Sequence, residues 1–334
     1  MTVFKSLSVI GGGAWGTALA NLAANNGVKT TIWAREPEAV AAINDHHMNS
    51  VFLDGEPLHP ALKAIPDLAE SGGAEAFLFV TPTQFARTVI PAMKAAAPRL
   101  DMPIALCSKG IENGTNLLMT EIFDEVWPEA SLAVLSGPSF ARDVVRGLPT
   151  AVTLACTDDQ LADKWVATIG ARHFRPYRSD DLIGAELGGA VKNVLAIAAG
   201  AVEGRGLGQS ARAALIARGF AEFQRLGLAL GAKAQTMAGL AGLGDLILTA
   251  TSQSSRNMSL GFELGQGTSL DKILAGRNSV SEGVATAKSV IALGQKAGVD
   301  LPVCHAVADL VSGVRTMDEI IEDLLTRPVG TEGN

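Results

Sequence analysis

Three glycines with dinucleotide-binding spacing stand near the beginning of the chain. Gly11, Gly13 and Gly16 form the pattern G-x-G-x-x-G after a short apolar run. In such a turn the first glycine allows the tight bend, the second lets the backbone approach a pyrophosphate, and the third lets a helix pack closely on a strand. The helix N-terminus then offers N–H groups to the phosphates. The pattern predicts a cofactor site that includes Ala14 and Trp15, whose indole either stacks on the cofactor or packs the turn against its strand.

The residues after the second expected strand bear on the choice between NAD and NADP. An NAD-selective site has an acidic residue roughly 20 residues after the turn, where it accepts a hydrogen bond from the ribose 2′-hydroxyl. Here the strand expected at residues 28–33 is followed by Ala34, Arg35 and Glu36. The Arg35 guanidinium can bind a 2′-phosphate. We therefore expect NADP(H) to be preferred, while Glu36 leaves NAD(H) possible.

Polar loops follow three other expected strands, at the edge where an open α/β sheet binds its ligands. Residues 81–84 form a turn suited to lie beneath a nicotinamide ribose, and Lys109 stands beside a glycine after the next strand. In the loop at residues 136–141, Gly137 and Ser139 can present a backbone N–H and a hydroxyl to an anion. Each loop alone is typical of an ordinary turn. Together at one edge they indicate a binding site.

A single lysine interrupts an otherwise apolar helical segment at residues 186–197. The segment is apolar almost all round, which predicts a buried helix. Lys192 loses solvation there, so it must be paired or have its pKa lowered, and a lowered pKa suits proton donation near neutral pH. The alternative is a lysine whose ammonium reaches solvent from the helix face. Gly188 and Gly189 favour the close approach of another backbone or of a ligand.

A run of hydrogen-bonding residues lies further along the same apolar half of the chain, at residues 242–246 and 249–257. Such polarity between helical patterns indicates the lining of a binding site, and a solvated loop is the alternative. Asp245 can accept a hydrogen bond from a substrate hydroxyl or from Lys192. The residues that can hold a phosphate are Ser255, Arg256 and Asn257.

Two kinds of segment must position these residues. In the first half, short apolar runs alternate with helical patterns, which predicts a doubly wound, Rossmann-type parallel sheet in an α/β domain. The expected strands span residues 6–10, 28–33, 77–80, 103–107, 132–135 and 151–154. In the second half the strand signals fade, and segments rich in Ala, Leu and Gly with helical spacing predict an all-α domain.

A capping-box pair, Thr316 and Glu319, predicts the start of one of the helices in that second domain. The boundary between the two domains is expected after Asp181. This division gives a dinucleotide-binding Rossmann domain at residues 1–181 and an all-helical substrate and catalytic domain at residues 182–334.

Composition excludes several classes of function. With 334 residues the chain exceeds one usual domain, and its net charge of −7 argues against a nucleic-acid surface. The apolar runs are interrupted well before the roughly 20 residues of a membrane span, so we expect a cytoplasmic protein. The three cysteines and five histidines show no metal-ligand spacing, so no metal site is expected. Apolar helical faces favour a possible homodimer.

Taken together, the motifs resemble one family, the NAD(P)-dependent glycerol-3-phosphate dehydrogenases of the bacterial type. The matching segments run in order along almost the whole chain: Gly-Gly-Gly-Ala-Trp-Gly-Thr-Ala-Leu-Ala from Gly11, Ser-Lys-Gly-Ile-Glu from Ser108, Ser-Gly-Pro-Ser-Phe-Ala from Ser136, Gly-Gly-Ala-Val-Lys-Asn-Val from Gly188, Gly-Leu-Gly-Asp-Leu from Gly242, Ser-Arg-Asn from Ser255 and Glu-Gly-Val from Glu282. Ala14 lacks the hydroxyl that many members carry within the turn, so one side-chain bond to the pyrophosphate is not expected.

The resemblance implies a role for each matching residue. Lys192 would be the catalytic proton donor and acceptor. The implied substrate contacts are Lys109, Gly137, Ser139, Lys192, Asp245, Ser255, Arg256 and Asn257. The implied cofactor contacts are Gly11, Gly13, Ala14, Trp15, Gly16, Arg35, Lys109, Ala141, Arg256, Val280 and Glu282. The family reduces the C2 ketone of dihydroxyacetone phosphate to sn-glycerol 3-phosphate and so supplies glycerophospholipid synthesis.

Without the resemblance, the motifs indicate hydride transfer on a small phosphorylated or acidic compound, and two other functions stay open. A dehydrogenase of the β-hydroxyacid or 6-phosphogluconate type also joins a dinucleotide fold to a helical domain with a lysine near an asparagine. A redox-sensing module would hold NADP(H) without chemistry. Such a module has no need for Lys192, Asp245 and the run from Ser255 to Asn257.

Overall fold

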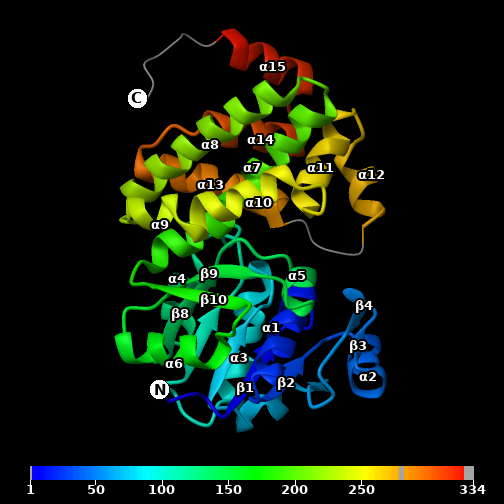
Figure 1. Cartoon of the computed structure of the whole chain (residues 1–334). Helices are drawn as coiled ribbons and strands as arrows, with labels where there is room; N and C mark the ends of the chain where they lie inside the picture. Colours follow the sequence, from blue (N-terminus) through cyan, green and yellow to red (C-terminus); the bar gives the residue numbers. More distant parts are fainter. Residues whose placement is uncertain (1, 278–281, 327–334) are drawn as a thin grey trace. The chain divides into compact units, whose positions relative to one another are not determined.

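The computed structural model describes residues 2–277 and 282–326, which fall into two compact units. Unit 1 comprises Met1–Lys109 and Leu117–Glu186, and unit 2 comprises Gly110–Asn116 and Leu187–Asn334. Unit 1 is an α/β structure, and unit 2 is built from helices (Figure 1). The functional boundary expected after Asp181 stays a prediction.

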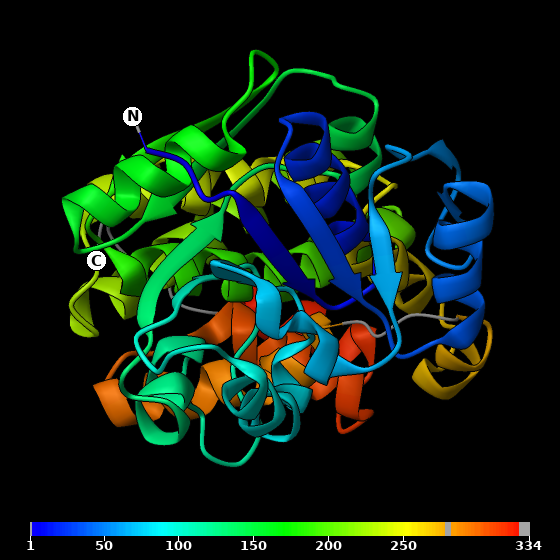
Figure 2. The ribbon, with the colours of Figure 1, turned by 90° about the horizontal axis from the view of Figure 1, so that it is seen from below.

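A sheet of eight strands forms the centre of unit 1, in the order β10-β9-β8-β7-β6-β1-β2-β5. The strands are β1 (Ser6–Ile10), β2 (Lys29–Trp33), β5 (Lys63–Ile65), β6 (Ala76–Phe79), β7 (Pro103–Leu106), β8 (Ser131–Ser136), β9 (Thr150–Ala155) and β10 (Phe174–Ser179). Figure 2 shows β1, β2 and β5 side by side in shades of blue, which agrees with their parallel pairing. Every residue of β6 and β7 is buried, as expected for strands covered on both faces.

Helices and a small hairpin complete unit 1. The helices are α1 (Ala14–Asn25), α2 (Pro37–His46), α3 (Ala86–Ala96), α4 (Met119–Val126), α5 (Ala141–Val145) and α6 (Asp159–Ile169), with short 3₁₀ turns η1 (Leu68–Gly73) and η2 (Thr83–Phe85). The hairpin pairs β3 (Met48–Asn49) with β4 (Leu53–Pro57) in antiparallel fashion. All six strands expected from the sequence are confirmed, while β3, β4, β5 and β10 were not expected.

The expected parallel sheet is confirmed, with the exception of one antiparallel pair of strands. β9 runs antiparallel to β8, whereas the other pairs in the eight-stranded sheet are parallel. The connection between them contains only the five-residue helix α5. Five helical residues advance about 7.5 Å, which is much less than the roughly 20 Å length of a six-residue strand. The helix is therefore too short to return the chain to the opposite end of the sheet.

The regular structure of unit 2 is helical throughout the residues described, as the sequence predicted. Its elements are α7 (Leu182–Gly204, which starts in the last residues of unit 1), α8 (Gln209–Ala229), α9 (Ala234–Ala238), the π-helical turn η3 (Leu240–Gly244), α10 (Asp245–Thr251), α11 (Arg256–Gly265), α12 (Leu270–Ala275), α13 (Glu282–Ala297), α14 (Pro302–Ser312) and α15 (Met317–Thr326). The predicted capping box is confirmed at α15, where Thr316 N donates to Glu319 Oε2 at 2.7 Å and Glu319 N donates to Thr316 Oγ1 at 3.3 Å.

Glycines bring the backbones of α7 and α11 into direct contact. Gly200 and Gly204 on α7 lie against carbonyl oxygens of α11, and Gly261 and Gly265 on α11 lie against carbonyl oxygens of α7. A Cβ atom built at any of the four would stand only 2.0–2.3 Å from the facing oxygen. Because residues four apart share one helix face, each pair forms a smooth surface for the partner helix. This contact places the start of α11 beside the middle of α7.

Among the described helices, α7 alone is long and apolar enough to cross a membrane by length and composition. However, 83% of its most apolar window is buried inside the protein. A helix that is apolar on all sides occurs in protein cores as well as in membranes. The burial of α7 is therefore accounted for by protein packing.

The close contact between α7 and α11 predicts that the stability of the protein depends on glycine at position 261. Gly261→Ala forces a methyl group against a backbone oxygen, and we expect it to lower the free energy of unfolding by about 1–3 kcal/mol. Without this contact, alanine in a helix interior stabilises by up to about 1 kcal/mol relative to glycine. Urea denaturation followed by circular dichroism measures the difference. The control is Gly73→Ala, where a Cβ meets no atom within 4 Å. Equal stability of both variants would contradict the close contact.

Candidate functional site

The glycine turn joins β1 to α1 as the sequence predicted. Gly11 has a φ of +130°, a conformation that side chains rarely adopt. A Cβ at Gly16 would lie 1.9 Å from the carbonyl oxygen of Gly11, so α1 can begin this close to the strand only with glycine there. A Cβ at Gly13 would meet nothing within 4 Å. Gly13 is thus the one of the three that faces the open space a pyrophosphate requires.

The N-terminus of α1 suits an anion. Its N-cap is Gly13, which makes no side-chain cap, and its first turn contains no acidic residue. The first N–H groups of a helix lack intrahelical partners and carry partial positive charge. A phosphate at this position meets both the N–H donors and the charge. Ala14 contributes only a methyl group at the start of the helix, so the donors here come from the backbone.

Three buried polar atoms at the same edge of the sheet have no hydrogen-bond partner among the described residues. They are Trp15 Nε1, Thr83 Oγ1 and Ser136 Oγ, which lie at or just beyond the carboxyl ends of β1, β6 and β8. Buried polar groups are nearly always hydrogen-bonded, so these atoms fit a polar ligand bound at this edge. The ring of Trp15 packs against the hydrophobic core, which favours packing over stacking for its apolar face.

Arg35 follows the carboxyl end of β2, where the sequence argument places the ribose. Its side chain is 74% exposed, and its Nη2 lies 3.2 Å from Glu36 Oε1. An exposed ion pair of this kind contributes little to stability. The guanidinium can therefore exchange Glu36 for a phosphate at small cost.

The structure brings Lys109, Gly137 and Ser139 together within unit 1. Lys109 Nζ donates to the carbonyl oxygen of Gly137 at 3.2 Å, and Ser139 Oγ donates to the same oxygen at 3.0 Å. Gly137 has a φ of +149°, and a Cβ there would stand 2.9 Å from the Cα of Val152. The loop thus keeps a lysine and a serine on one carbonyl group. Ala141 is the first residue of α5, which follows this loop.

Lys192 is largely buried and paired in unit 2. Its Nζ lies 2.6 Å from Asp245 Oδ1 on α10 and 3.0 Å from Thr249 Oγ1 on the same helix. The side chains of Lys192 and Asp245 are 10% and 0% exposed. The alternative of a lysine that reaches solvent is therefore wrong, and of the two ways to accommodate a buried lysine the structure shows pairing. Gly188 supports this arrangement, since a Cβ there would stand 2.2 Å from the carbonyl oxygen of Ala241.

Thr249 belongs to the polar run that the sequence analysis marked, but it was not singled out there as a partner of Lys192. Its hydroxyl donates to the backbone oxygen of Asp245 at 2.7 Å, so the oxygen is left to accept from Lys192. The signal was present, because Thr249 stands four residues after Asp245 and residues at this spacing share a helix face. The ammonium of Lys192 is consequently held from two directions by one turn of α10.

The predicted phosphate-binding run lies at the N-terminus of α11. Asn257 Nδ2 donates to Asn193 Oδ1 at 2.9 Å, which joins α11 to the residue after Lys192. Ser255 is the N-cap of α11, and its hydroxyl accepts from Met258 N at 3.3 Å. The side chain of Arg256 is exposed. The structure thus places Asn257 beside the lysine helix, while the hydroxyl of Ser255 already serves the helix cap.

Two further predicted cofactor contacts come from the last part of unit 2. Glu282 is the first residue of α13. Val280 lies outside the described residues.

Two buried glutamates cap helices away from these groups. Glu186 accepts hydrogen bonds from Thr120 N at 2.9 Å and Thr120 Oγ1 at 2.7 Å, and burial raises its pKa to about 7. Glu222 accepts from Val303 N at 2.8 Å and Cys304 N at 3.2 Å, and burial likewise raises its pKa to about 7. Both carboxyl groups satisfy N–H donors at helix N-termini, at α4 and α14. We assign them structural roles.

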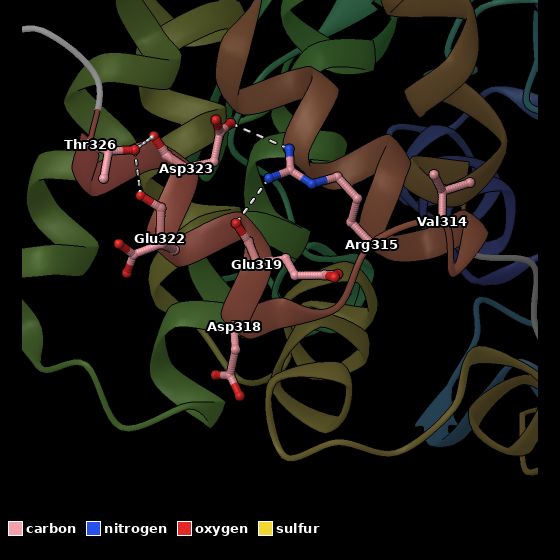
Figure 3. A pocket seen from close by; sticks show the side chains of 7 residues that line it. All are labelled: Val314, Arg315, Asp318, Glu319, Glu322, Asp323 and Thr326. Atoms are coloured by element: carbon pink, nitrogen blue, oxygen red, sulfur yellow. Dashed lines mark hydrogen bonds and ion pairs between the residues drawn. The ribbon is translucent and has the colours of Figure 1, made fainter.

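A hollow beside α15 is a poor match for a phosphorylated substrate. Figure 3 shows its lining, which comprises Val314, Arg315, Asp318, Glu319, Glu322, Asp323 and Thr326. The single guanidinium is already bonded to Asp323 Oδ2 at 3.3 Å and to the Glu319 carbonyl oxygen at 2.9 Å. Four carboxylates around one arginine repel a phosphate. None of the predicted site residues lines this hollow.

Within the part of the chain that is described, no group of three or more His, Cys, Asp or Glu side chains is arranged to hold a metal ion. The three cysteines are free and buried, and burial raises the pKa of the Cys107 thiol. A buried neutral thiol is a weak nucleophile.

The buried pair makes a prediction for stability. Asp245→Asn removes the carboxylate that faces the Lys192 ammonium, and removing one partner of a buried pair costs about 3–5 kcal/mol. We expect the free energy of unfolding to fall by this order in urea denaturation. The double variant Lys192→Met, Asp245→Asn removes the buried charge as well, so it should be more stable than Asp245→Asn alone. The single variant Lys192→Met is measured as well. If the double variant loses as much free energy of unfolding as the two single variants lose together, the two side chains are not paired.

The chain matches known proteins over most of its length. Two family models match the chain: the N-terminus of NAD-dependent glycerol-3-phosphate dehydrogenase over residues 6–162 and its C-terminus over residues 181–322. A protein of Parvibaculum lavamentivorans named glycerol-3-phosphate dehydrogenase, with the qualifier NAD(P)+, is 54% identical over 331 residues, covering 98% of each chain. A Caulobacter vibrioides protein of the same name is 54% identical over 329 residues, covering 98% of this chain and 99% of its own.

A solved structure shows the same fold. The crystal structure of glycerol-3-phosphate dehydrogenase from Coxiella burnetii superposes with a TM-score of 0.92 at 37% identity, covering 97% of this chain and 99% of that one. The family matches, the full-length relatives and this structure agree. The chain belongs to the NAD-dependent glycerol-3-phosphate dehydrogenase family.

Proposed function

We propose that this chain catalyses the NAD(P)H-dependent reduction of dihydroxyacetone phosphate to sn-glycerol 3-phosphate, and the reverse oxidation. The observation that carries the proposal is the buried Lys192, held by Asp245 and Thr249. Relatives that match this chain over nearly their whole length are named for glycerol-3-phosphate and NAD(P)+. A lysine ammonium is one of the groups that can supply the proton that reduction of a ketone needs.

The residues of unit 1 fit a dinucleotide. The open space at Gly13 and the uncapped N-terminus of α1 suit the pyrophosphate, and the unpartnered buried atoms of Trp15, Thr83 and Ser136 can bond polar groups of the cofactor. When bound, NAD(P)H supplies the hydride for the C2 carbon of the substrate. Arg35 supports a preference for NADP(H), because its exposed guanidinium stands where a ribose 2′-phosphate is expected.

Lys192 supplies the proton. Negative charge develops on the carbonyl oxygen during reduction, and the ammonium group stabilises that charge and then donates its proton to the oxygen. Asp245 and Thr249 fix the direction of Nζ before the reaction, so little reorganisation is needed. In the reverse direction the neutral amine accepts the proton of the C2 hydroxyl. The carboxylate of Asp245 favours return of a proton to the amine from solvent.

The substrate phosphate is proposed to bind at the N-terminus of α11, through Arg256 and Asn257. A helix N-terminus and a guanidinium are both suited to a phosphate. Lys109, Gly137, Ser139 and Ser255 are proposed as further substrate contacts. Binding of a phosphate remote from the ketone helps to align C2 for reaction. We propose Lys109, Ala141, Arg256, Val280 and Glu282 as cofactor contacts in addition to the glycine turn and Arg35.

The next proposals concern the compartment, the oligomeric state and the metabolic role of the protein. We propose that the chain works in the cytoplasm as a homodimer and supplies glycerol phosphate for glycerophospholipids. Residues 1–181 are proposed to bind the dinucleotide and residues 182–334 to carry the catalytic lysine.

A substrate panel tests the proposed activity. The purified protein is assayed for NADPH oxidation with dihydroxyacetone phosphate, and in parallel with 2-oxo and 3-oxo acids and, with NADP+, for oxidation of 6-phosphogluconate. We expect turnover with dihydroxyacetone phosphate only. Turnover with the acids instead would support the β-hydroxyacid type of dehydrogenase. Binding of NADPH without turnover of any substrate would indicate a sensing module.

Lys192→Ala tests the role of the lysine. Because general acid catalysis contributes typically about 10²–10⁴-fold, we expect kcat to fall by at least about 100-fold. NADPH affinity, measured by fluorescence titration, should stay nearly unchanged, and circular dichroism reports on the fold. Equal loss of turnover and NADPH affinity would argue against a catalytic lysine.

Arg35→Ala tests the choice of cofactor. Hydrogen bonds to a charged group contribute about 1.5–3 kcal/mol, so we expect the preference for NADPH over NADH in kcat/KM to fall by about tenfold or more. The KM for NADPH should rise, whereas the KM for NADH should stay nearly unchanged. An unchanged NADPH/NADH ratio refutes the assignment.

A further inference from the structure

The β3–β4 hairpin holds the glycine turn through one buried side chain. Asn49 on β3 is fully buried, and its Nδ2 donates to the carbonyl oxygen of Gly12 at 2.8 Å and to Thr17 Oγ1 at 2.7 Å. Its Oδ1 accepts from Phe52 N at 3.2 Å, within the hairpin itself. The amide is thus bonded at both ends. It joins a hairpin to a turn that lies 37 residues earlier in the chain.

The bond to Gly12 fixes the direction of the next N–H group. A peptide unit is planar, and no peptide bond in the described residues is cis. In a trans peptide unit the N–H points opposite to the carbonyl group. Since the carbonyl of Gly12 points inward to Asn49, the N–H of Gly13 points the other way. Gly13 is the residue whose Cβ position is open, so this N–H faces the space proposed for the pyrophosphate.

Thr17 adds a second bond to the same carbonyl. Its hydroxyl lies 3.4 Å from the Gly12 oxygen and also receives the hydrogen bond of Asn49. Gly12 itself is packed tightly, because a Cβ there would stand 2.4 Å from the Cβ of Ala34. The turn therefore has little freedom on its buried side. Of the two side chains that bond the Gly12 carbonyl, Asn49 makes the shorter hydrogen bond, at 2.8 Å against 3.4 Å for Thr17.

The hairpin is in turn fastened to α5 through Arg142 and the C-cap residue Arg146. Glu56 on β4 has a side chain only 5% exposed, and it pairs with Arg146 at 2.7 Å and with Arg142 at 3.4 Å. Arg142 also donates to the backbone oxygen of Asp54 at 3.1 Å. α5 directly follows the loop that contains Gly137 and Ser139. The hairpin thus connects the glycine turn with a second element at the same edge of the sheet.

We propose that Asn49 is a positioning residue for dinucleotide binding, which acts by holding the Gly12–Gly13 peptide group in the orientation that directs the Gly13 N–H at the pyrophosphate. The inference rests on the proposed function only in that the turn binds a dinucleotide. It adds a residue outside the glycine motif to the determinants of cofactor affinity.

Two variants of Asn49 test this role. Asn49→Ala removes the amide, and Asn49→Leu removes it while nearly keeping the buried volume, in case the alanine variant folds poorly. Loss of a neutral hydrogen bond corresponds to about 0.5–1.5 kcal/mol, so we expect the Kd for NADPH to rise about 3- to 10-fold in fluorescence titration. The KM for NADPH should rise similarly, with kcat at saturating NADPH and the KM for dihydroxyacetone phosphate unchanged within twofold.

The matched control is Asn21→Ala. Asn21 is also a buried asparagine on unit 1, and its Oδ1 accepts from His59 N at 2.7 Å without touching the turn carbonyl. Its loss should lower the urea midpoint and leave the Kd for NADPH unchanged. An unchanged Kd in both Asn49 variants, or an equal rise in Asn21→Ala, overturns the positioning role. Because Kd is measured without turnover, a wild type that binds NADPH but does not reduce dihydroxyacetone phosphate overturns the proposed function alone.

Discussion

Backbone contact between α7 and α11 is the constraint on which unit 2 depends. Four glycines allow it, and larger residues there would separate the two helices. The contact sets the start of α11 beside the middle of α7, where Asn257 bonds to Asn193. The neighbouring Lys192 can be buried in so apolar a helix because Asp245 and Thr249 face it from α10. The pairing of Lys192 thus depends on the approach of α10, which Gly188 allows by its close contact with Ala241.

Glycines also allow close backbone contacts at the candidate site of unit 1. Glycine allows α1 to begin against the end of β1 and allows the loop after β8 to pass close to β9. Close backbone approach leaves N–H groups, rather than side chains, to meet a phosphate. Such groups need to be oriented, and the hairpin carrying Asn49 and Glu56 provides bonds on the side away from the ligand. The orientation of the glycine turn thus depends on residues that lie outside the glycine motif.

Local patterns predicted much of this architecture. Apolar runs marked six strands, and the capping box marked the start of α15. β5 escaped because it has only three residues, and β10 because its Arg and Pro residues do not resemble a buried strand. The direction of β9 depends on the short length of α5. The Lys192–Asp245 pair joins residues 53 apart, so sequence could suggest it only as one alternative. Asn49 gave no signal, because its partners lie in another element.

Transfer of isotope from the cofactor tests the central claim most directly. Dihydroxyacetone phosphate is incubated with the protein and NADPH that carries deuterium at the transferable position of nicotinamide C4, and the product is analysed by mass spectrometry and NMR. The account predicts glycerol 3-phosphate with one deuterium, located at C2. Product without deuterium at C2, or no product while NADPH binds normally, would contradict the account.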